Sequence, residues 1–225
     1  MRWLGLGDGE RLDGDVAVLS PHLDDAILSL GAAIAAARGE VSVVTVFAGD
    51  PDSTLEAGEW DSRAGFRTAG EAAHARREED ALACVDVGAR PVWLPFVDHQ
   101  YPPEHDEAIW AALVAALEGA ETVLVPAFPL IHPDHERLLG MVEQNGLPCR
   151  RLGRYIEQPY AAAWTDRPPG DGWLPLAAGL PQRVIKLRAC RRYASQLRLL
   201  RRGGPVLRRV AMYEAVRGGE SVSWS

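Results

Sequence analysis

The fold of this chain is decided by one stretch of sequence, Val16-Ala17-Val18-Leu19-Ser20-Pro21-His22-Leu23-Asp24-Asp25. It opens with a continuous apolar run, which is typical of a strand buried on both faces. A second apolar run, 122–126, precedes the segment His132-Pro133-Asp134-His135. Imidazoles and carboxylates therefore follow two predicted strands. Two imidazoles and one carboxylate leave part of a Zn²⁺ coordination sphere open for water, as in catalytic zinc sites.

Apolar runs alternate with alanine-rich amphipathic segments along the chain. We expect strands over 16–19, 41–47, 91–96, 122–126 and 151–157, and helices over 25–38, 70–85, 104–118, 133–145 and 186–201. This alternation predicts an α/β fold, with an open, mostly parallel sheet and helices on both faces. The length of 225 residues fits a single domain over residues 1–225.

Residues that follow the strands should meet at one edge of such a sheet, because ligands bind outside the carboxyl ends of parallel strands. We expect this edge to unite the two polar segments with the loop that begins near Asp50 and with Asp98-His99. A dinucleotide site is not expected, because the turn after the first strand has no G-x-G-x-x-G pattern.

Composition narrows the class of protein further. The net charge of −7 and the lack of a dense basic run argue against nucleic-acid binding. Cys84, Cys149 and Cys190 are far apart and form no C-x-x-C pair, which suits the reduced thiols of a cytoplasmic protein. The apolar stretch 26–37 is shorter than the ~20 residues of a membrane span, and no signal peptide is evident. We expect a cytoplasmic protein with a small-molecule partner; a homo-oligomer stays open.

The two polar segments resemble the motifs of the PIG-L/LmbE-like family of metal-dependent N-acetylglucosaminyl deacetylases. Members carry an (A/S)-H-P-D-D-E motif after the first strand and an H-x-D-H motif after a later one. Here Leu23 replaces the proline and Ala26 the glutamate of the first motif. The segments 60–61, 76–80, 155–161 and 186–196 also resemble the family. The resemblance implies a Rossmann-like (LmbE-like) fold and a Zn²⁺-dependent hydrolase, with Fe²⁺ or another divalent metal as alternatives. Its substrate would be an N-acyl, most often N-acetyl, amino sugar or a GlcNAc-containing conjugate.

The resemblance also implies roles for single residues. His22, Asp25 and His135 would hold the metal, and His132 would lie beside the substrate carbonyl, where a protonated imidazole could stabilise the oxyanion or protonate the leaving amine. Asp24 lies between two ligands and is suited to be the general base. Either aspartate could instead cap the following helix. Asp134 either holds one histidine in its tautomer or is a surface acid at a helix start.

Candidates for substrate binding are Arg63, Arg76 and Asp98. The alternatives are a solvated ion pair for Arg76 and a turn-forming role for Asp98. The long segments 48–68 and 162–181 are candidate lids or, alternatively, passive surface loops. His74, His99 and His105 match no ligand position of the family.

Two other functions stay open on the sequence. His22, Asp24 and His135 would also fit the 2-His-1-carboxylate site of an Fe(II)-dependent oxygenase. Those enzymes mostly have double-sheet β folds, whereas this chain alternates strands and helices. A non-catalytic sugar- or metal-binding module is the third reading, and the intact candidate base argues against it.

Overall fold

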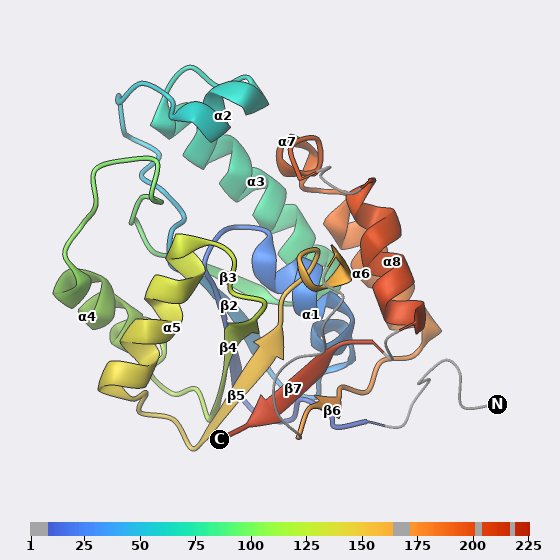
Figure 1. Cartoon of the computed structure of the whole chain (residues 1–225). Coiled ribbons are helices and arrows are strands. Elements are labelled where there is room, and N and C mark those ends of the chain that lie inside the picture. Colours follow the sequence, from blue (N-terminus) through green and yellow to red (C-terminus); the bar gives the residue numbers. More distant parts are fainter. Residues whose placement is uncertain (1–8, 164–171, 201–203, 217–218) are drawn as a thin grey trace.

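The computed structural model describes residues 9–163, 172–200, 204–216 and 219–225. Its centre is a seven-stranded sheet in the order β3-β2-β1-β4-β5-β7-β6 (Figure 1). The five parallel strands are β1 (Val16–Ser20), β2 (Val41–Thr45), β3 (Arg90–Trp93), β4 (Thr122–Phe128) and β5 (Arg151–Ile156). The antiparallel extension consists of β7 (Ser221–Trp224) beside β5 and β6 (Leu174–Pro175) beside β7. The predicted α/β class and mostly parallel sheet are confirmed.

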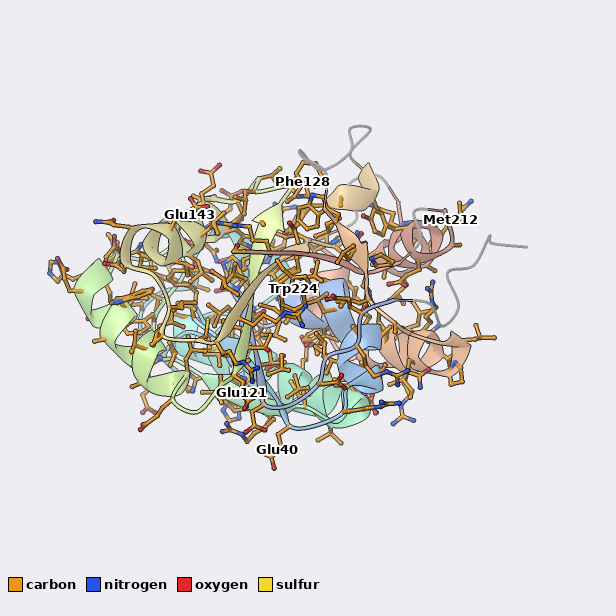
Figure 2. All side chains as sticks on the ribbon, turned by 90° about the horizontal axis from the view of Figure 1, so that it is seen from below. Glu40, Glu121, Phe128, Glu143, Met212 and Trp224 are labelled. Atoms are coloured by element: carbon orange, nitrogen blue, oxygen red, sulfur yellow. The ribbon has the colours of Figure 1, made fainter. Side chains whose placement is uncertain are left out.

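Helices cover both faces of the sheet (Figure 1). One face carries α1 (Asp25–Ala36), α3 (Ala69–Val87), α6 (Leu180–Cys190) and α8 (Val206–Val216). The other face carries α4 (Asp106–Ala116) and α5 (Pro133–Asn145). Viewed from below, Met212 of α8 and Glu143 of α5 lie on opposite sides of the molecule, with Trp224 between them (Figure 2). The short elements are α2 (Glu59–Ala64), η1 (Ala161–Ala163) and α7 (Ala194–Leu197).

The central strand β1 is buried on both faces because its alternate side chains enter different cores. Val16 and Val18 pack with α1 and α3, whereas Ala17 and Leu19 pack with α4 and α5. This explains the unbroken apolar run, since a strand covered by helices on both sides has no solvent face. The carboxyl end of β1 is therefore anchored in two cores, and the turn that follows it is held rigidly.

Helix boundaries follow local signals. Thr68 caps α3 by accepting a hydrogen bond from the Glu71 amide at 3.1 Å. Gly88 ends the same helix in the left-handed conformation, with φ of 78°. Pro133 lies in the first turn of α5, where its missing N–H leaves no helical bond unmade.

The C-terminal part differs from the prediction. The helix expected over 186–201 begins earlier, as α6, and ends at Cys190. The chain turns there, which buries Tyr193 and lets its hydroxyl donate to Asp80 Oδ1 at 2.7 Å. The expected strand 91–96 is also too long, because β3 ends at Trp93, two residues before Pro95. Helices α2 and α8 and strands β6 and β7 were not predicted.

Candidate metal centre and active site

The first polar segment forms the turn between β1 and α1. The Ser20 hydroxyl donates to the His22 carbonyl and accepts from the Ala26 amide at 3.0 Å. The His22 amide donates to Asp25 Oδ2 at 2.9 Å. Asp24 occupies the N-cap position of α1, but its side chain makes no capping hydrogen bond. The turn is thus held by Ser20 and Asp25, and the Asp24 carboxylate is left for another role.

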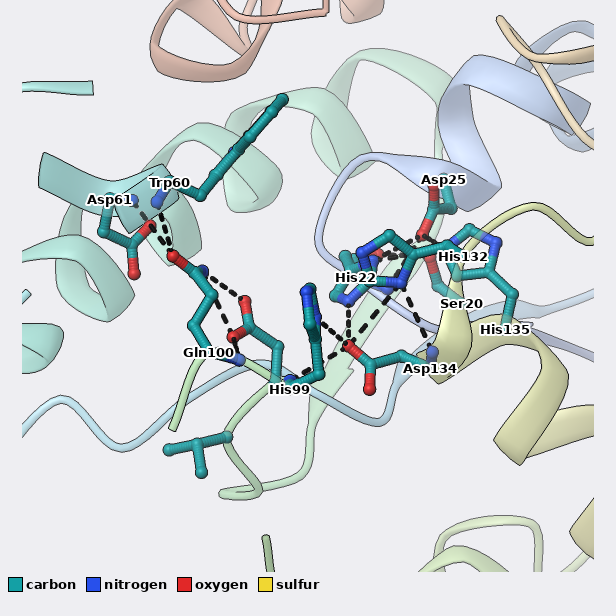
Figure 3. A network of polar contacts seen from close by, with 12 residues as sticks. Ser20, His22, Asp25, Trp60, Asp61, His99, Gln100, His132, Asp134 and His135 are labelled. Carbon is teal, nitrogen blue, oxygen red and sulfur yellow. Dashed lines mark hydrogen bonds and ion pairs between the residues drawn. The ribbon is translucent and has the colours of Figure 1, made fainter. Parts of the chain in front are cut away.

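Three side chains from the two polar segments converge at this turn (Figure 3). Asp25 Oδ2 lies 3.3 Å from His22 Nδ1 and 3.1 Å from His135 Nε2, and the two nitrogens are 3.2 Å apart. Ligand atoms of a tetrahedral zinc ion are separated by about 3.4 Å, given ligand distances of about 2.1 Å. His22, Asp25 and His135, all buried, therefore have the spacing and donor atoms of a divalent metal site.

The opposite nitrogen of each histidine ring faces a carboxylate. His22 Nε2 lies 3.0 Å from Asp134 Oδ2, and His135 Nδ1 is hydrogen-bonded to Glu157, directly after β5. Such pairs fix the tautomer and the ring orientation of metal-binding histidines. Asp134 is buried, so it is a histidine partner and not a surface acid. Glu157 was missed by the sequence reasoning, although a glutamate that ends an apolar strand at this sheet edge was a usable signal.

Carboxylates dominate the electrostatics of the centre. Burial opposes ionisation of Asp25, but the charges of His135 and His22 hold its pKa well below the usual range. Burial also opposes protonation of His22, yet hydrogen bonds to Asp134 and Asp25 raise its pKa to about 9. Asp25, Asp134 and Glu157 together surround the two rings, so a bound cation would meet a strongly negative environment.

Asp24 and His132 lie beside the three ligand residues. Burial, and next the charge of Asp25, raise the pKa of Asp24 to about 7. The His132 ring centroid lies 4.7 Å from that of His22 and 5.1 Å from that of His135. Burial and the neighbouring histidines lower the pKa of His132 to about 3. The ring is therefore neutral at neutral pH, and in that form it can donate one hydrogen bond.

Two of the three predicted substrate residues meet in a pocket. Arg76 of α3 is buried, with Nη1 at 3.1 Å from Asp61 Oδ1 and 3.8 Å from Asp98 Oδ2. The pocket beside them is also lined by Leu23 and Tyr101. Arg63 does not join them: it is exposed, with its guanidinium 5.6 Å from the Trp60 ring.

The 48–68 segment is tied to the body of the protein at several points. The Trp60 amide donates to Gln100 Oε1 at 2.7 Å, and its indole donates to Gln196 Oε1 at 2.8 Å. The Tyr101 hydroxyl donates to Asp61 at 2.6 Å. These bonds hold the segment against the body of the protein, and Asp50 and Asp61 within it line the pocket. Of the second candidate lid, 162–181, residues 164–171 lie outside the described residues.

Among the described helices, none is long and apolar enough to cross a membrane. Among the described residues, two groups have potential metal-binding atoms within 4.8 Å of one another. One consists of His22, His132 and His135, and the other of His99, His132 and Asp134.

Comparisons with known proteins agree with the fold. The A40926 pseudoaglycone deacetylase Dbv21 superposes with a TM-score of 0.72 at 28% identity, over 93% of this chain and 96% of that one. A triple mutant of a deacetylase of the teicoplanin biosynthetic pathway gives 0.73 at 26% identity, with the same coverage. The N,N'-diacetylchitobiose deacetylase of Pyrococcus horikoshii shares the fold, with a TM-score of 0.59 at 20% identity. The superposition covers 97% of this chain and 84% of that one.

No curated protein matched the sequence. The family model described as PIG-L, GlcNAc-PI de-N-acetylase, matches residues 17–144, more than half of the chain. The matched segment contains both polar motifs and four of the five parallel strands. The chain therefore belongs to the PIG-L family of de-N-acetylases.

Proposed function

We propose that the protein is a metal-dependent deacylase that removes an N-acyl group, most often acetyl, from an amino sugar or a GlcNAc-containing conjugate. The observation that carries this proposal is the convergence of His22 Nδ1, Asp25 Oδ2 and His135 Nε2 within 3.3 Å of one another. Beside them lies Asp24, a buried carboxylate without a capping bond. Membership of the de-N-acetylase family supports the same conclusion.

His22, Asp25 and His135 would hold the metal, and the donor set suits Zn²⁺ or Fe²⁺. When bound, either ion supplies a polarised acyl carbonyl and a water of lowered pKa. Glu157 and Asp134 keep the two imidazoles in the tautomers that point Nε2 of His135 and Nδ1 of His22 at the ion.

The remaining residues move the protons and orient the sugar. Asp24 accepts a proton from the attacking water, and its pKa of about 7 lets it pass that proton to the leaving amine. The neutral His132 ring donates a hydrogen bond to the acyl oxygen as negative charge develops there. Arg76 and Asp98 offer a donor and an acceptor for sugar hydroxyls. The open parallel sheet argues against the Fe(II) oxygenase, whose usual fold is a double β-sheet.

A deacylation screen tests the proposal. The protein, reconstituted with Zn²⁺ or Fe²⁺, is incubated with N-acyl amino sugars, chitobiose derivatives and N-acyl glycosaminyl glycopeptides, and the released amine is measured. We include glycopeptides because one relative of this fold is an A40926 pseudoaglycone deacetylase and another is a deacetylase of the teicoplanin biosynthetic pathway. We expect metal-dependent amine release from at least one class, without consumption of O₂ or 2-oxoglutarate. Oxidant-dependent turnover would favour the oxygenase, and binding without turnover would favour a non-catalytic module.

A further inference from the structure

The pocket beside the candidate metal centre is lined by both apolar and charged side chains. Leu23 and Phe47 belong to its apolar lining, and the Phe47 ring centroid lies 6.1 Å from that of His22. The charged side chains of the lining are Asp50, Asp61, Arg76 and Asp98. A sugar whose acyl group lies at the metal centre can therefore extend its other substituents into this pocket.

The charge balance of this lining is negative, because three carboxylates face one guanidinium. Arg76 Nη1 is already shared between Asp61 Oδ1 at 3.1 Å and Asp98 Oδ2 at 3.8 Å. Asp50 is exposed, and within the part of the chain that the structure describes it forms no ion pair; its Oδ1 accepts from the Asp52 amide at 3.0 Å. A cation would meet an excess of negative charge here, whereas an anion would have to compete with two aspartates for Arg76.

The distribution of charge along the chain strengthens this preference. Residues 172–225 hold eleven of the 24 basic residues but only two of the 31 acidic ones. The pocket and the metal centre are built from residues that precede this segment. The part of the chain that builds them is therefore more acidic than the net charge of −7 indicates. A cleft with one sign of charge raises the local concentration of ligands of the opposite sign.

Arg76 adds a requirement of a different kind. It is 8% exposed, and among the described residues its Nε has no hydrogen-bond partner. An unpaired buried donor is costly, and a ligand that supplies an acceptor removes that cost. A hydroxyl oxygen is a suitable acceptor, because it adds no negative charge to the pocket. The lining thus suits a hydroxyl next to an ammonium group, an arrangement that amino sugars provide.

We propose that this pocket selects substrates that carry a second, free amino group close to the acylated sugar. The ammonium group lies beside Asp50 and Asp98, and a neighbouring hydroxyl accepts from Arg76 Nε. Substrates with a phosphate or a carboxylate in the same place are disfavoured. The inference rests on the deacylase function proposed above and narrows its substrate class.

Three glycosides of N-acetylglucosamine with aglycones of similar size test the preference. The 2-aminoethyl, 2-hydroxyethyl and carboxymethyl glycosides carry a cationic, a neutral and an anionic group, and released acetate is measured with metal-reconstituted protein at low salt. We expect kcat/KM to be on the order of tenfold higher for the aminoethyl than for the hydroxyethyl glycoside, and lowest for the carboxymethyl glycoside. These differences should shrink at high salt, which screens the charges.

Asp50→Asn tests whether the preference arises in the pocket. The amide oxygen of asparagine can still accept from the Asp52 amide, so the turn is kept while one charge is removed. The ratio of kcat/KM for the aminoethyl glycoside to that for the carboxymethyl glycoside should fall by roughly three- to tenfold. Asp52→Asn is the matched control, because this exposed aspartate lies in the same loop but does not line the pocket; it should keep the wild-type ratio.

Equal kcat/KM for the three glycosides, or a preference for the carboxymethyl glycoside, would overturn the proposal. So would a ratio that Asp50→Asn and Asp52→Asn lower equally, since the preference would then not arise in the pocket. If no glycoside is turned over, the proposed function fails, and calorimetric binding of the same three glycosides still decides the charge preference.

Discussion

Asp24 and Asp25 are adjacent and both buried, yet their surroundings give them different chemistry. Asp25 faces two imidazoles, which keep it ionised despite its burial. For Asp24, burial and the charge of Asp25 outweigh the charges of Arg76 and His22 and raise its pKa to about 7. One carboxylate is thus suited to hold a cation and the other to exchange a proton.

Substitution of Asp24 separates these two roles. Asp24→Asn should retain the metal but lower kcat on the order of 10²–10⁴-fold, because an amide cannot accept the proton. His135→Ala should instead lose the metal. Metal content by emission spectrometry and steady-state rates distinguish the two variants. A near wild-type rate in Asp24→Asn would move the base to another residue, and full metal affinity in His135→Ala would refute the ligand set.

Glu157 is predicted to act only through His135. Glu157→Gln should lower metal affinity by about 10- to 100-fold, since it weakens the bond that orients the ligand. Glu143→Gln is the control, because this glutamate is an exposed partner of Arg154. Competition with a chelator measures both affinities. Equal affinities of the two variants would remove Glu157 from the metal centre.

At the scale of elements, α3 connects the pocket to the rest of the protein. In the first half of this helix, Arg76 forms ion pairs with Asp61 of α2 and with Asp98 in the segment after β3. One turn later, Asp80 accepts hydrogen bonds from Trp93 of β3 and Tyr193, each at 2.7 Å. The helix thereby fixes the wall of the pocket relative to the sheet.

This arrangement predicts different effects for the two candidate arginines. Arg76→Lys should lower kcat/KM by roughly 10- to 100-fold through KM, since hydrogen bonds of charged groups contribute about 1.5–3 kcal/mol. Arg63→Ala should change kcat/KM little, because Arg63 is exposed beside Trp60. Metal content should stay unchanged in both. A larger loss in Arg63→Ala would show that substrate extends over α2.

Asp80 should make stability depend on pH. Burial raises its pKa from 3.8 to about 6, so the unfolded chain loses this proton at lower pH than the folded protein does. The free energy of unfolding should therefore fall as pH rises from about 4 to 6, by up to about 3 kcal/mol from this group. Asp80→Asn should lack this component. Urea denaturation at pH 4, 5, 6 and 7 measures it, and parallel curves for both proteins would contradict it.

At the scale of the whole molecule, a buried charge cluster joins the C-terminal segment to the first helix. Lys186 Nζ of α6 donates to Glu214 of α8 and to Glu220, each at 2.6 Å, and to the Ser29 carbonyl of α1 at 3.2 Å. Glu220 in turn accepts from the amides of Ala32 and Ala33. These bonds hold α6, α8 and the start of β7 against α1, which follows the metal-binding turn.

Loss of the buried lysine should therefore destabilise the protein. Lys186→Met leaves the buried Glu220 without a cation and Glu214 with Arg183 as its ion-pair partner, which costs about 3–5 kcal/mol of unfolding free energy. Arg188→Met on the same helix removes an exposed partner of Asp86 and should cost at most about 1 kcal/mol. Chemical denaturation compares the two. A smaller effect in Lys186→Met would mean that the cluster adds little to stability.

The parallel core and its chemistry could be predicted from the sequence, because both are encoded locally. A continuous apolar run predicts a strand with two covered faces, and a polar segment after it predicts the functional edge. His22, Asp25 and His135 belong to two such segments, and the structure brings their ligand atoms together. The general-base and substrate-binding roles stay predictions.

Tertiary structure decided what depends on distant partners. Arg63 and Arg76 are both substrate-binding candidates in the sequence, and only the fold buries Arg76 beside Asp61 and leaves Arg63 exposed beside Trp60. The link from Glu157 to His135 exists because β5 lies next to β4. Short segments such as α8 and β7 have weak local signals, and their burial comes from contacts made across the chain. A sequence pattern determines which face of an element is apolar, but only the folded chain determines what covers it.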